Sequence, residues 1–359
     1  MEIALPQNPA QWCGLALAVT AASLGLTALL RRYALRRHLL DIPNARSSHT
    51  APTPRGGGAA IVASLFAALA VAGYMDMLPA ALVWTLMGAG GLVALAGLID
   101  DHGHLAVRWR LLAHFIAAAA CLHALPKHPG LFGAAPPPSG SALAFLVCGE
   151  ALYLVWMLNL YNFMDGIDGL AGTEAICAGL GGALLFLSGG APDLAAAPFL
   201  LAAAAAGFLY WNWPPARIFM GDAGSGFLGF AFGVLSLHAA LHAPALFWGW
   251  MILLAVFICD ASLTLARRAF AGARIHEAHR SHAYQHAARR WGHRSVTLAV
   301  AAINIFWLLP LALAAVPGHV PPTIALAAAY APLLALAWTL DAGKDEGAHA
   351  HKQPPSPSV

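Results

Sequence analysis

Charged residues are scarce in this sequence of 359 residues: Asp, Glu, Lys and Arg make up 10% of it, whereas hydrophobic residues make up 60%. Soluble domains carry about a quarter charged residues, so this composition excludes an ordinary soluble protein. The small net charge of +3 is dispersed along the chain, which argues against a nucleic-acid partner. We therefore expect a membrane protein.

Cysteine clusters are also missing, and we expect no cleaved leader segment. The five cysteines lie in or beside apolar runs without CxxC spacing, so they indicate neither a disulfide framework nor a zinc site. The first apolar run, about 12–30, has no basic segment before it, and Arg31, Arg32, Arg36 and Arg37 follow it instead. A cleaved signal peptide has the opposite arrangement. We interpret this run as a first membrane helix whose N-terminus lies outside.

Long apolar runs fill most of the remaining sequence. A helix needs about 20 apolar residues to cross the core of a bilayer, where backbone groups must be satisfied internally. Windows of this length predict an all-α polytopic membrane protein with a single transmembrane catalytic domain, 1–341, and a disordered cytoplasmic tail, 342–359. About eleven transmembrane helices are expected, near 12–30, 57–75, 78–98, 108–125, 143–161, 170–189, 194–212, 223–241, 245–265, 296–316 and 321–340.

The basic residues indicate how this helix bundle is oriented. With eleven spans and a periplasmic N-terminus, one side receives the loops 31–56, 99–110, 159–169, 213–222 and 266–295 together with the C-terminal tail. These segments hold 18 of the 19 Lys and Arg residues. The positive-inside rule makes this side cytoplasmic. The acidic and His-bearing clusters fall on the same side, so we expect an active site at the cytoplasmic boundary of the bilayer.

Two neighbouring carboxylates, Asp100 and Asp101, end the third predicted span. Adjacent residues on a helix face different directions, so we expect one to point at the chemistry and the other to hold a second partner. Paired carboxylates suit a divalent cation or a general base that handles a phosphate proton. An ordinary solvated helix end is the alternative.

The fifth predicted span is followed by Asn162, Asp165 and Asp168, with glycines between them. A helical turn would put the two Asp side chains on one face, and Gly166 would let the backbone approach a ligand closely. Ionisable groups near membrane depth are functional candidates by default. Loop punctuation alone would explain the glycines but not the three polar side chains.

A run of small residues begins at Asp222 and opens the eighth predicted span. Its first amides and the helix dipole are expected to receive phosphate oxygens, and Asp222 to hold Mg²⁺ against the same phosphates. Phe219 is a candidate for stacking on a base. The alternative for Asp222 is a helix N-cap, a role that Asp often fills.

Basic and imidazole side chains are concentrated in two of the loops. In the largest loop, His279, Arg280 and His282 are candidates for clamping a diphosphate, while positive-inside charge explains the other arginines there. The loop 31–56 is polar and rich in Pro and Gly, and is a candidate cover for a sugar nucleotide. Any Pro/Gly-rich loop shares these features, so this indication is weak alone.

Together these segments resemble the polyprenyl-phosphate N-acetylhexosamine-1-phosphate transferase superfamily. The resemblance covers nearly the whole chain. It is carried by Arg-Ser-Ser-His and Pro-Thr-Pro-Arg-Gly-Gly-Gly in the first loop, Asp-Asp, Asn-Phe-Met-Asp-Gly-Ile-Asp-Gly, Phe-Met-Gly-Asp-Ala-Gly-Ser and His-Arg-Ser-His, in family order. Five motifs in order on one face are a strong signal, where a single one would be weak.

The resemblance implies a multi-pass enzyme of the bacterial inner membrane with its active site on the cytoplasmic face. Its substrates would be UDP-N-acetylhexosamine and undecaprenyl phosphate, with UMP as the leaving group. It implies Mg²⁺ as cofactor, with Mn²⁺ as a possible substitute, and makes a homodimer possible. By motif, Asp222 and Asn162 would hold the metal, and Asp100, Asp101 and Asp165 would be catalytic. Nucleotide and substrate would contact Gly166, Ile167, Asp168, Phe219, Arg46, His49, Arg55, His279, Arg280 and His282.

Two departures separate the chain from the peptidoglycan branch of this superfamily. The phospho-N-acetylmuramoyl-pentapeptide transferases carry three consecutive histidines where this chain has His279-Arg280-Ser281-His282, and their first loop differs. Both differences resemble the O-antigen and capsule branch. The motifs leave open whether the lipid phosphate attacks directly or an aspartate first forms a covalent intermediate.

A rival class with buried carboxylates is the ion-coupled transporter. Transporter sites tend to lie near the bilayer midplane, whereas the acidic groups here fall at the predicted cytoplasmic ends. Asp260, inside the ninth predicted span, is interpreted as a helix–helix polar contact or as support for the site.

Overall fold

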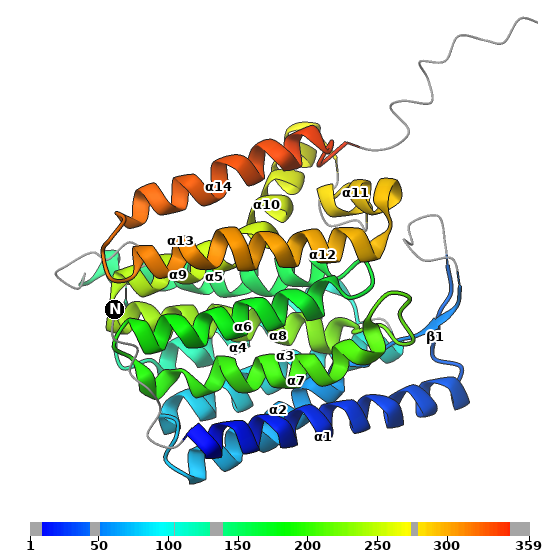
Figure 1. Ribbon diagram of the computed structural model, residues 1–359, viewed down its shortest axis with the longest axis horizontal. Coiled ribbons are helices and arrows are strands. Elements are labelled where there is room, and N and C mark those ends of the chain that lie inside the picture. The colour runs from blue at the N-terminus through cyan, green and yellow to red at the C-terminus, as the bar shows by residue number, and fades with distance from the viewer. Residues whose placement is uncertain (1–8, 44–50, 104, 130–138, 274–278, 345–359) are drawn as a thin grey trace, which may run out of the picture.

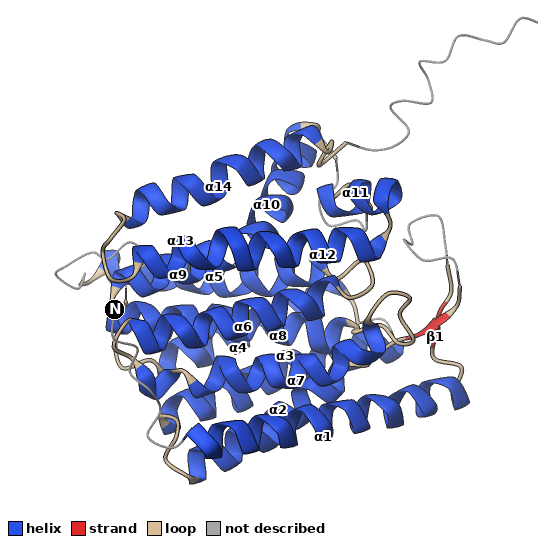
Figure 2. Cartoon of the chain, viewed as in Figure 1, coloured by secondary structure: helices blue, strands red, loops and turns tan. Residues whose placement is uncertain are grey.

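The computed structural model describes residues 9–43, 51–103, 105–129, 139–273 and 279–344. Within these residues the protein is a bundle of roughly aligned helices with one pair of very short strands (Figures 1 and 2). The strand pair and the short amphipathic helix α11 (Ala283–Trp291) lie at one end of the bundle, the right-hand end in Figure 1.

The elements are defined by the following bounds. In chain order they are α1 (Pro9–Arg36), β1 (Leu40–Asp41), β2 (Thr53–Pro54), α2 (Gly58–Tyr74), α3 (Ala80–Gly103), α4 (Val107–Ala124), α5 (Ser141–Met164), α6 (Leu170–Ser188), the 3₁₀ turn η1 (Pro192–Leu194), α7 (Ala196–Asn212), α8 (Asp222–His242), α9 (Pro244–Leu253), α10 (Ala255–Phe270), α11 (Ala283–Trp291), α12 (His293–Ile303), the π-helical turn η2 (Asn304–Leu308), α13 (Leu309–Ala315) and α14 (Pro322–Thr339).

The prediction of an all-α polytopic membrane protein is confirmed. Among the described residues, eight helices are long and apolar enough to cross a bilayer, or nine if α9 and α10 count as one span. The helix α2 is apolar but has only 17 residues, and α4 carries Arg108 and Arg110 in its first turn. Each predicted span coincides with a helix or a series of helices. The count of eleven and the orientation of the termini stay predictions.

The helix α8 is the centre of the bundle. From Ala223 to Ala239 every residue is buried, while α2, α3 and α5 pack around the helix. A helix that is apolar and buried all round belongs to the core of a large or membrane-embedded protein. The arrangement fixes the first residue of α8, Asp222, between the ends of several other helices.

Glycines allow these helices to pack at close range. A Cβ built on Gly97 of α3 would lie 2.5 Å from the backbone of Asp222, and one built on Gly58 of α2 would lie 2.4 Å from Cα of Gly224. Membrane helices associate through such small residues, because lipid provides little hydrophobic driving force between helices. The α3–α8 contact therefore brings the Asp100–Asp101 pair to the start of α8.

The ninth predicted span, 245–265, is not one continuous helix. The chain breaks at Leu254, where α9 and α10 differ in direction by 72°. Three polar residues, Asp260, Thr264 and Arg268, are spaced four apart on α10, and all are buried. A straight span would carry this polar stripe along the bilayer, whereas the bend lets it face the backbone and side chains of residues 281–284.

The first loop is tied to the segment before α8 by backbone hydrogen bonds. The strands β1 and β2 pair in antiparallel register, Leu40 opposite Pro54. Beyond β2, the amide of Phe219 donates to the carbonyl of Pro54 over 2.8 Å, and the amide of Gly57 donates to the carbonyl of Phe219 over 2.9 Å. Two motifs that lie far apart in the sequence thus form one surface.

The C-terminal region continues as ordered chain beyond the last helix. The amide of Gly343 donates to the carbonyl of Ser281 over 2.7 Å, and Ala342 is fully buried. Residues 345–359 of the predicted tail lie outside the described residues, so their disorder stays a prediction.

Candidate active site

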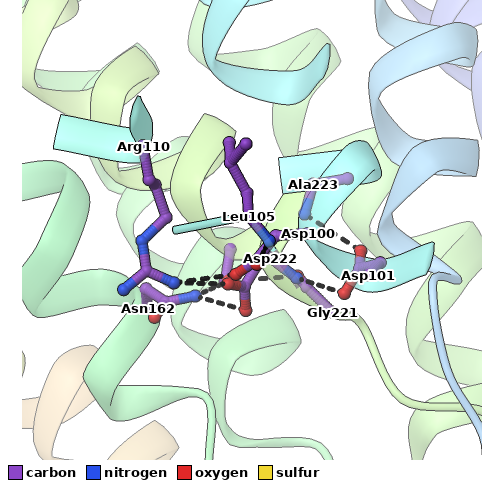
Figure 3. Close-up of polar contacts among 9 residues, drawn as sticks. Asp100, Asp101, Leu105, Arg110, Asn162, Gly221, Asp222 and Ala223 are labelled. Atoms are coloured by element: carbon purple, nitrogen blue, oxygen red, sulfur yellow. Dashed lines mark hydrogen bonds and ion pairs between the residues drawn. The ribbon is translucent and has the colours of Figure 1, made fainter. Parts of the chain in front are cut away.

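The motifs that contain Asp100, Asn162 and Asp222 meet at the N-terminal end of α8. Arg110 on α4 places its Nη1 2.8 Å from Oδ2 of Asp100 and 3.3 Å from Oδ2 of Asp222 (Figure 3). The amide nitrogen Nδ2 of Asn162 donates to Oδ1 of Asp222 over 3.0 Å and to Oγ of Ser225 over 2.8 Å. Helices α3, α4, α5 and α8 therefore converge on one carboxylate, that of Asp222.

The two neighbouring aspartates at the end of α3 have different partners. Oδ1 of Asp100 accepts from the amide of Leu105 over 2.6 Å, and its other oxygen faces Arg110. Asp101 instead accepts from the amides of Asp222 and Ala223 over 3.0 and 3.2 Å. Asp101 thus caps the N-terminus of α8 from another helix.

The expectation that the first amides of α8 bind phosphate is wrong for this conformation. Asp101 occupies the amides of Asp222 and Ala223, and those of Gly224 and Ser225 donate to the carbonyl of Gly221. Gly221 has φ +77°, and an added Cβ would lie 2.6 Å from the carboxylate of Asp101. A glycine is therefore required at position 221. Gly221 is the N-cap of α8, so Asp222 is the first residue of the helix, and its side chain makes no capping hydrogen bond.

The segment between α5 and α6 is not helical. The helix α5 ends at Met164 and α6 begins at Leu170, with Gly169 at φ +77°. The expectation that Asp165 and Asp168 share a helix face is therefore wrong, because the glycines break the helix between them. Asp165 lies on the side of the site, whereas Asp168 lies against another loop.

The carboxyl group of Asp165 is in an environment that disfavours its charge. Burial raises the pKa of Asp165 well above its usual range, and the negative charges of Asp222 and Asp101 raise it further. A cation brought among these groups would stabilise the ionised form. Asp165 is thus a site residue whose charge depends on what else is bound.

Asp168 joins two parts of the chain outside the carboxylate cluster. Its Oδ2 accepts from the amide of Ala216 over 3.0 Å, and Nδ1 of His293 lies 3.3 Å from Oδ1. Its backbone carbonyl accepts from the hydroxyl of Thr297. The side chain of Ile167, another predicted nucleotide contact, is 5% exposed and packs in the hydrophobic core. The roles of both residues in nucleotide binding stay predictions.

Polar residues within α10 and at the start of α11 form a second cluster beside the first. Oδ1 of Asp260 accepts from the amide of Ala283 over 3.0 Å and lies 3.2 Å from Nδ1 of His282, while Oδ2 accepts from the amide of Tyr284 over 2.9 Å. The hydroxyl of Thr264 also donates to Oδ1. Asp260 thus caps α11 and fixes the imidazole of His282.

The His282 ring is part of a stack. The ring of His279 lies 5.0 Å from it at an interplanar angle of 22°, and the ring of Phe163 lies 6.3 Å from it at 29°. The hydroxyl of Tyr284 donates to the carbonyl of Phe163 over 2.9 Å. A Cβ on Gly166 would overlap this hydroxyl, so Gly166 is needed for the contact.

A groove of about 720 Å³ connects the two clusters. Its polar end contains Asn162, Asp222, His279 and His282, and its walls include the apolar side chains Leu111, Leu152, Val155, Trp156 and Leu265. The predicted metal residues and the predicted diphosphate residues therefore share one opening, which continues along the apolar faces of α4 and α5.

The structure says less about the remaining predicted nucleotide and substrate contacts. Arg46 and His49 lie outside the described residues. Arg55 is close enough for its positive charge to act on Asp101. The backbone of Phe219 is held by the first loop. Their contacts with a nucleotide stay predictions, as does that of Arg280.

Two site residues were missed from the sequence, Arg110 and Tyr284, whereas Asp260 supports the site through His282, one of the two roles expected for it. Arg110 is masked by the general excess of arginines on that side of the protein. The sequence carries one sign that Asp260 belongs to a polar face: Asp260, Thr264 and Arg268 follow one another at intervals of four residues.

Comparison with known proteins relates the site to a family. Residues 82–240, which include the Asp pair, the 162–169 segment and the start of α8, match the model of glycosyl transferase family 4. This match and the names of the relatives support the polyprenyl-phosphate N-acetylhexosamine-1-phosphate transferase superfamily.

Relatives of the chain carry names from this superfamily. A probable undecaprenyl-phosphate N-acetylglucosaminyl 1-phosphate transferase of Bacillus subtilis is 29% identical over 68% of this chain and 68% of its own length. The undecaprenyl-phosphate alpha-N-acetylglucosaminyl 1-phosphate transferase of Thermotoga maritima is 28% identical over 80% of this chain and 87% of its own length. The decaprenyl-phosphate N-acetylglucosaminephosphotransferase of Mycolicibacterium smegmatis is 33% identical over 61% of this chain, which spans 60% of that relative.

Proposed function

We propose that this transferase moves an N-acetylhexosamine 1-phosphate from a UDP-sugar to undecaprenyl phosphate and releases UMP. The names of the relatives support a polyprenyl phosphate as acceptor and an N-acetylglucosamine 1-phosphate group as the transferred part. The single observation that carries the proposal is the convergence of Asp100, Asn162 and Asp222 at the polar end of an apolar groove.

The groove fits an acceptor that is a long hydrocarbon with a phosphate at one end. Its apolar walls include residues of α4 and α5, and its polar end contains Asn162, Asp222 and His282. A polyprenyl chain in the groove would bring its phosphate to these residues while the chain stays in the bilayer. The nucleotide sugar would approach from the water side, where the loops lie.

The donor atoms fit a Mg²⁺ ion that is completed by substrate. Within the described residues, no three His, Cys, Asp or Glu side chains form a metal-holding group by themselves. Mg²⁺ commonly takes one or two carboxylates and fills its other positions with water and phosphate oxygens. Asp222 and the oxygen of Asn162 would hold it, with Asp100 beside them. The bound ion would supply neutralisation of the diphosphate charge.

The chain's own residues would orient the reactants for a direct displacement. An oxygen of the lipid phosphate attacks the sugar-linked phosphorus, and the bond from that phosphorus to the UMP oxygen breaks, with the electron pair leaving on UMP. Asp100, held by Arg110, would orient the lipid phosphate or accept its remaining proton. His282, fixed by Asp260 through Nδ1, would present its Nε2 to a phosphate or sugar group.

The physiological role we propose is the first membrane step of O-antigen, capsule or related envelope glycan synthesis at the inner membrane. The sequence around His279 and in the first loop supports this branch over the muramoyl-pentapeptide branch. The active site would then lie on the cytoplasmic face, where UDP-sugars are made, in agreement with the distribution of Lys and Arg.

The proposal is tested with membranes that contain the full chain. They are incubated with undecaprenyl phosphate and a panel of radiolabelled UDP-N-acetylhexosamines, and both labelled lipid and free UMP are measured with Mg²⁺ and with EDTA. We expect Mg²⁺-dependent, equimolar formation of the two products with one or more donors. Absence of labelled lipid with every donor, in membranes where the protein is folded, would overturn the proposal.

A further inference from the structure

A second groove lies on the surface between α6 and α7, apart from the catalytic groove. It has a volume of about 670 Å³, and no residue lining it also lines the catalytic groove. Its apolar part is formed by Ile176, Ala206 and Leu209, and its rim by Tyr210, Trp213, Pro214, Pro215 and Arg217. The groove thus combines an apolar part with a rim that carries a positive charge.

Arg217 lines this rim, and a second arginine, Arg31, contacts it from α1. The guanidinium carbon of Arg217 lies 5.1 Å from the ring centroids of both Tyr210 and Trp211, and that of Arg31 lies 5.8 Å from the ring of Trp211. Nε of Arg31 donates to the carbonyl of Arg217 over 3.2 Å, which joins α1 to the loop after α7. These ring contacts hold both cations in place.

Neither arginine is neutralised by a residue that the structure describes. Across the described ranges, no carboxylate lies within ion-pair distance of Arg31 or Arg217. Two adjacent like charges repel each other, and an anion between them would remove that cost. The two positive charges therefore favour an anionic ligand over a neutral one.

The depth of the groove fits a lipid that keeps its headgroup at the water boundary. Ala206 and Leu209 lie within α7, which ends at Asn212, whereas Arg217 follows that end. The indole of Trp211 donates to the carbonyl of Leu24 over 3.0 Å, so this end of α7 is fixed against α1. An acyl chain in the groove would place a phosphate near the two guanidinium groups.

We propose that this groove binds an anionic glycerophospholipid, with its phosphate on Arg31 and Arg217 and an acyl chain along α6 and α7. Basic pockets between membrane helices on the cytoplasmic side suit such headgroups, and the anionic leaflet supplies the ligand. A free phosphate would leave the apolar part of the groove unused. The site is independent of the transfer reaction proposed above.

The experiment measures lipid retention on the full chain purified in detergent. Phosphatidylglycerol and phosphatidylcholine with the same acyl chains are added in equal amounts, and bound lipid is counted by native mass spectrometry. We expect one preferentially retained phosphatidylglycerol. Arg31→Gln and Arg217→Gln should each weaken its retention about fivefold, the effect of one basic group near a membrane surface.

Matched variants separate this site from general surface charge. Arg32→Gln removes the neighbouring, exposed arginine of α1 and should leave retention unchanged. Ala206→Phe fills the apolar part, keeps both arginines and should also reduce retention. Each variant is first checked for an unchanged thermal unfolding midpoint.

Three outcomes would overturn the proposal. The first is equal retention of the two lipids by the wild-type protein. The second is an equal loss in Arg31→Gln and Arg32→Gln. The third is displacement of phosphatidylglycerol by glycerol 3-phosphate at the same concentration, which would identify a site for free phosphate. Failure of sugar-phosphate transfer in the donor panel would leave these lipid measurements unaffected, so the two proposals fail separately.

Discussion

The carboxylate of Asp260 lies 3.2 Å from Nδ1 of His282 and also accepts from the amides of Ala283 and Tyr284. Because a carboxylate can only accept, Nδ1 of His282 is the protonated nitrogen in this contact. The other ring nitrogen, Nε2, is then available in the groove that His282 lines. Asp260 is a positioning residue that acts through His282.

Asp260→Asn should therefore lower kcat by about 10- to 100-fold, the usual effect of removing a group that orients a functional histidine. Thr264→Val removes only a hydroxyl contact to Asp260 and is the matched control. Wild-type rates in Asp260→Asn would show that the contact is structural.

Asp222→Asn should abolish transfer, with a loss of at least about 100-fold, because it removes the carboxylate on which four helices converge. UMP release measures the reaction, and a thermal melt checks the fold. Asp193→Asn, an exposed position in η1, is the control. Near-normal turnover in Asp222→Asn would refute the metal assignment.

Arg110→Gln should make the protein more dependent on Mg²⁺ for its stability. Without Arg110, Asp100 and Asp222 lose the cation that both contact. We expect the melting temperature in EDTA to fall by about 2–4 °C, since these are partly exposed pairs of modest strength, and Mg²⁺ to restore most of the loss. Arg108→Gln, an exposed arginine on the same turn, should have no such effect. An equal fall with and without Mg²⁺ contradicts this prediction.

The raised pKa of Asp165 predicts a pH dependence of stability in the absence of metal. Above the ordinary pKa of Asp, the unfolded chain is ionised while the folded chain keeps its proton, so the folded state binds more protons. Stability must then fall as the pH rises from that ordinary value towards the raised one. Asp165→Asn should flatten this fall in melting curves recorded in EDTA. A wild-type protein whose melting temperature rises over that range would contradict the assignment.

Much of the arrangement follows from elementary patterns in the sequence. Apolar windows located the helices, and the one-sided distribution of Lys and Arg grouped Asp100, Asn162 and Asp222 on one face before any contact was known. The structure places these three side chains together. Spacing within a span, and the side on which a span ends, are properties of the local sequence, so they are accessible without tertiary information.

The partners of these residues depend on packing between distant segments. Asp101 caps α8 because Gly97 lets α3 approach α8 closely, a contact across more than 100 positions of sequence. The helical interpretation of 165–168 failed because Gly166 and Gly169 serve a turn that packs on Tyr284 and Asn212. The break at Leu254 has the same origin, since Asp260 and Arg268 of the polar stripe on α10 bond to the segment that begins at Ser281.

The buried position of α8 also bears on how the protein is made. Three of its four main neighbours, α2, α3 and α5, precede it in the chain and the fourth, α9, follows directly, so most of the cradle for α8 is already synthesised when Asp222 leaves the ribosome. A nascent chain that stops before α8 has an unfilled centre, and one that stops after it already holds the carboxylates Asp100, Asp101, Asp165 and Asp222. Assembly of the metal-binding end therefore belongs to the first two thirds of translation, before α10 and α11 exist.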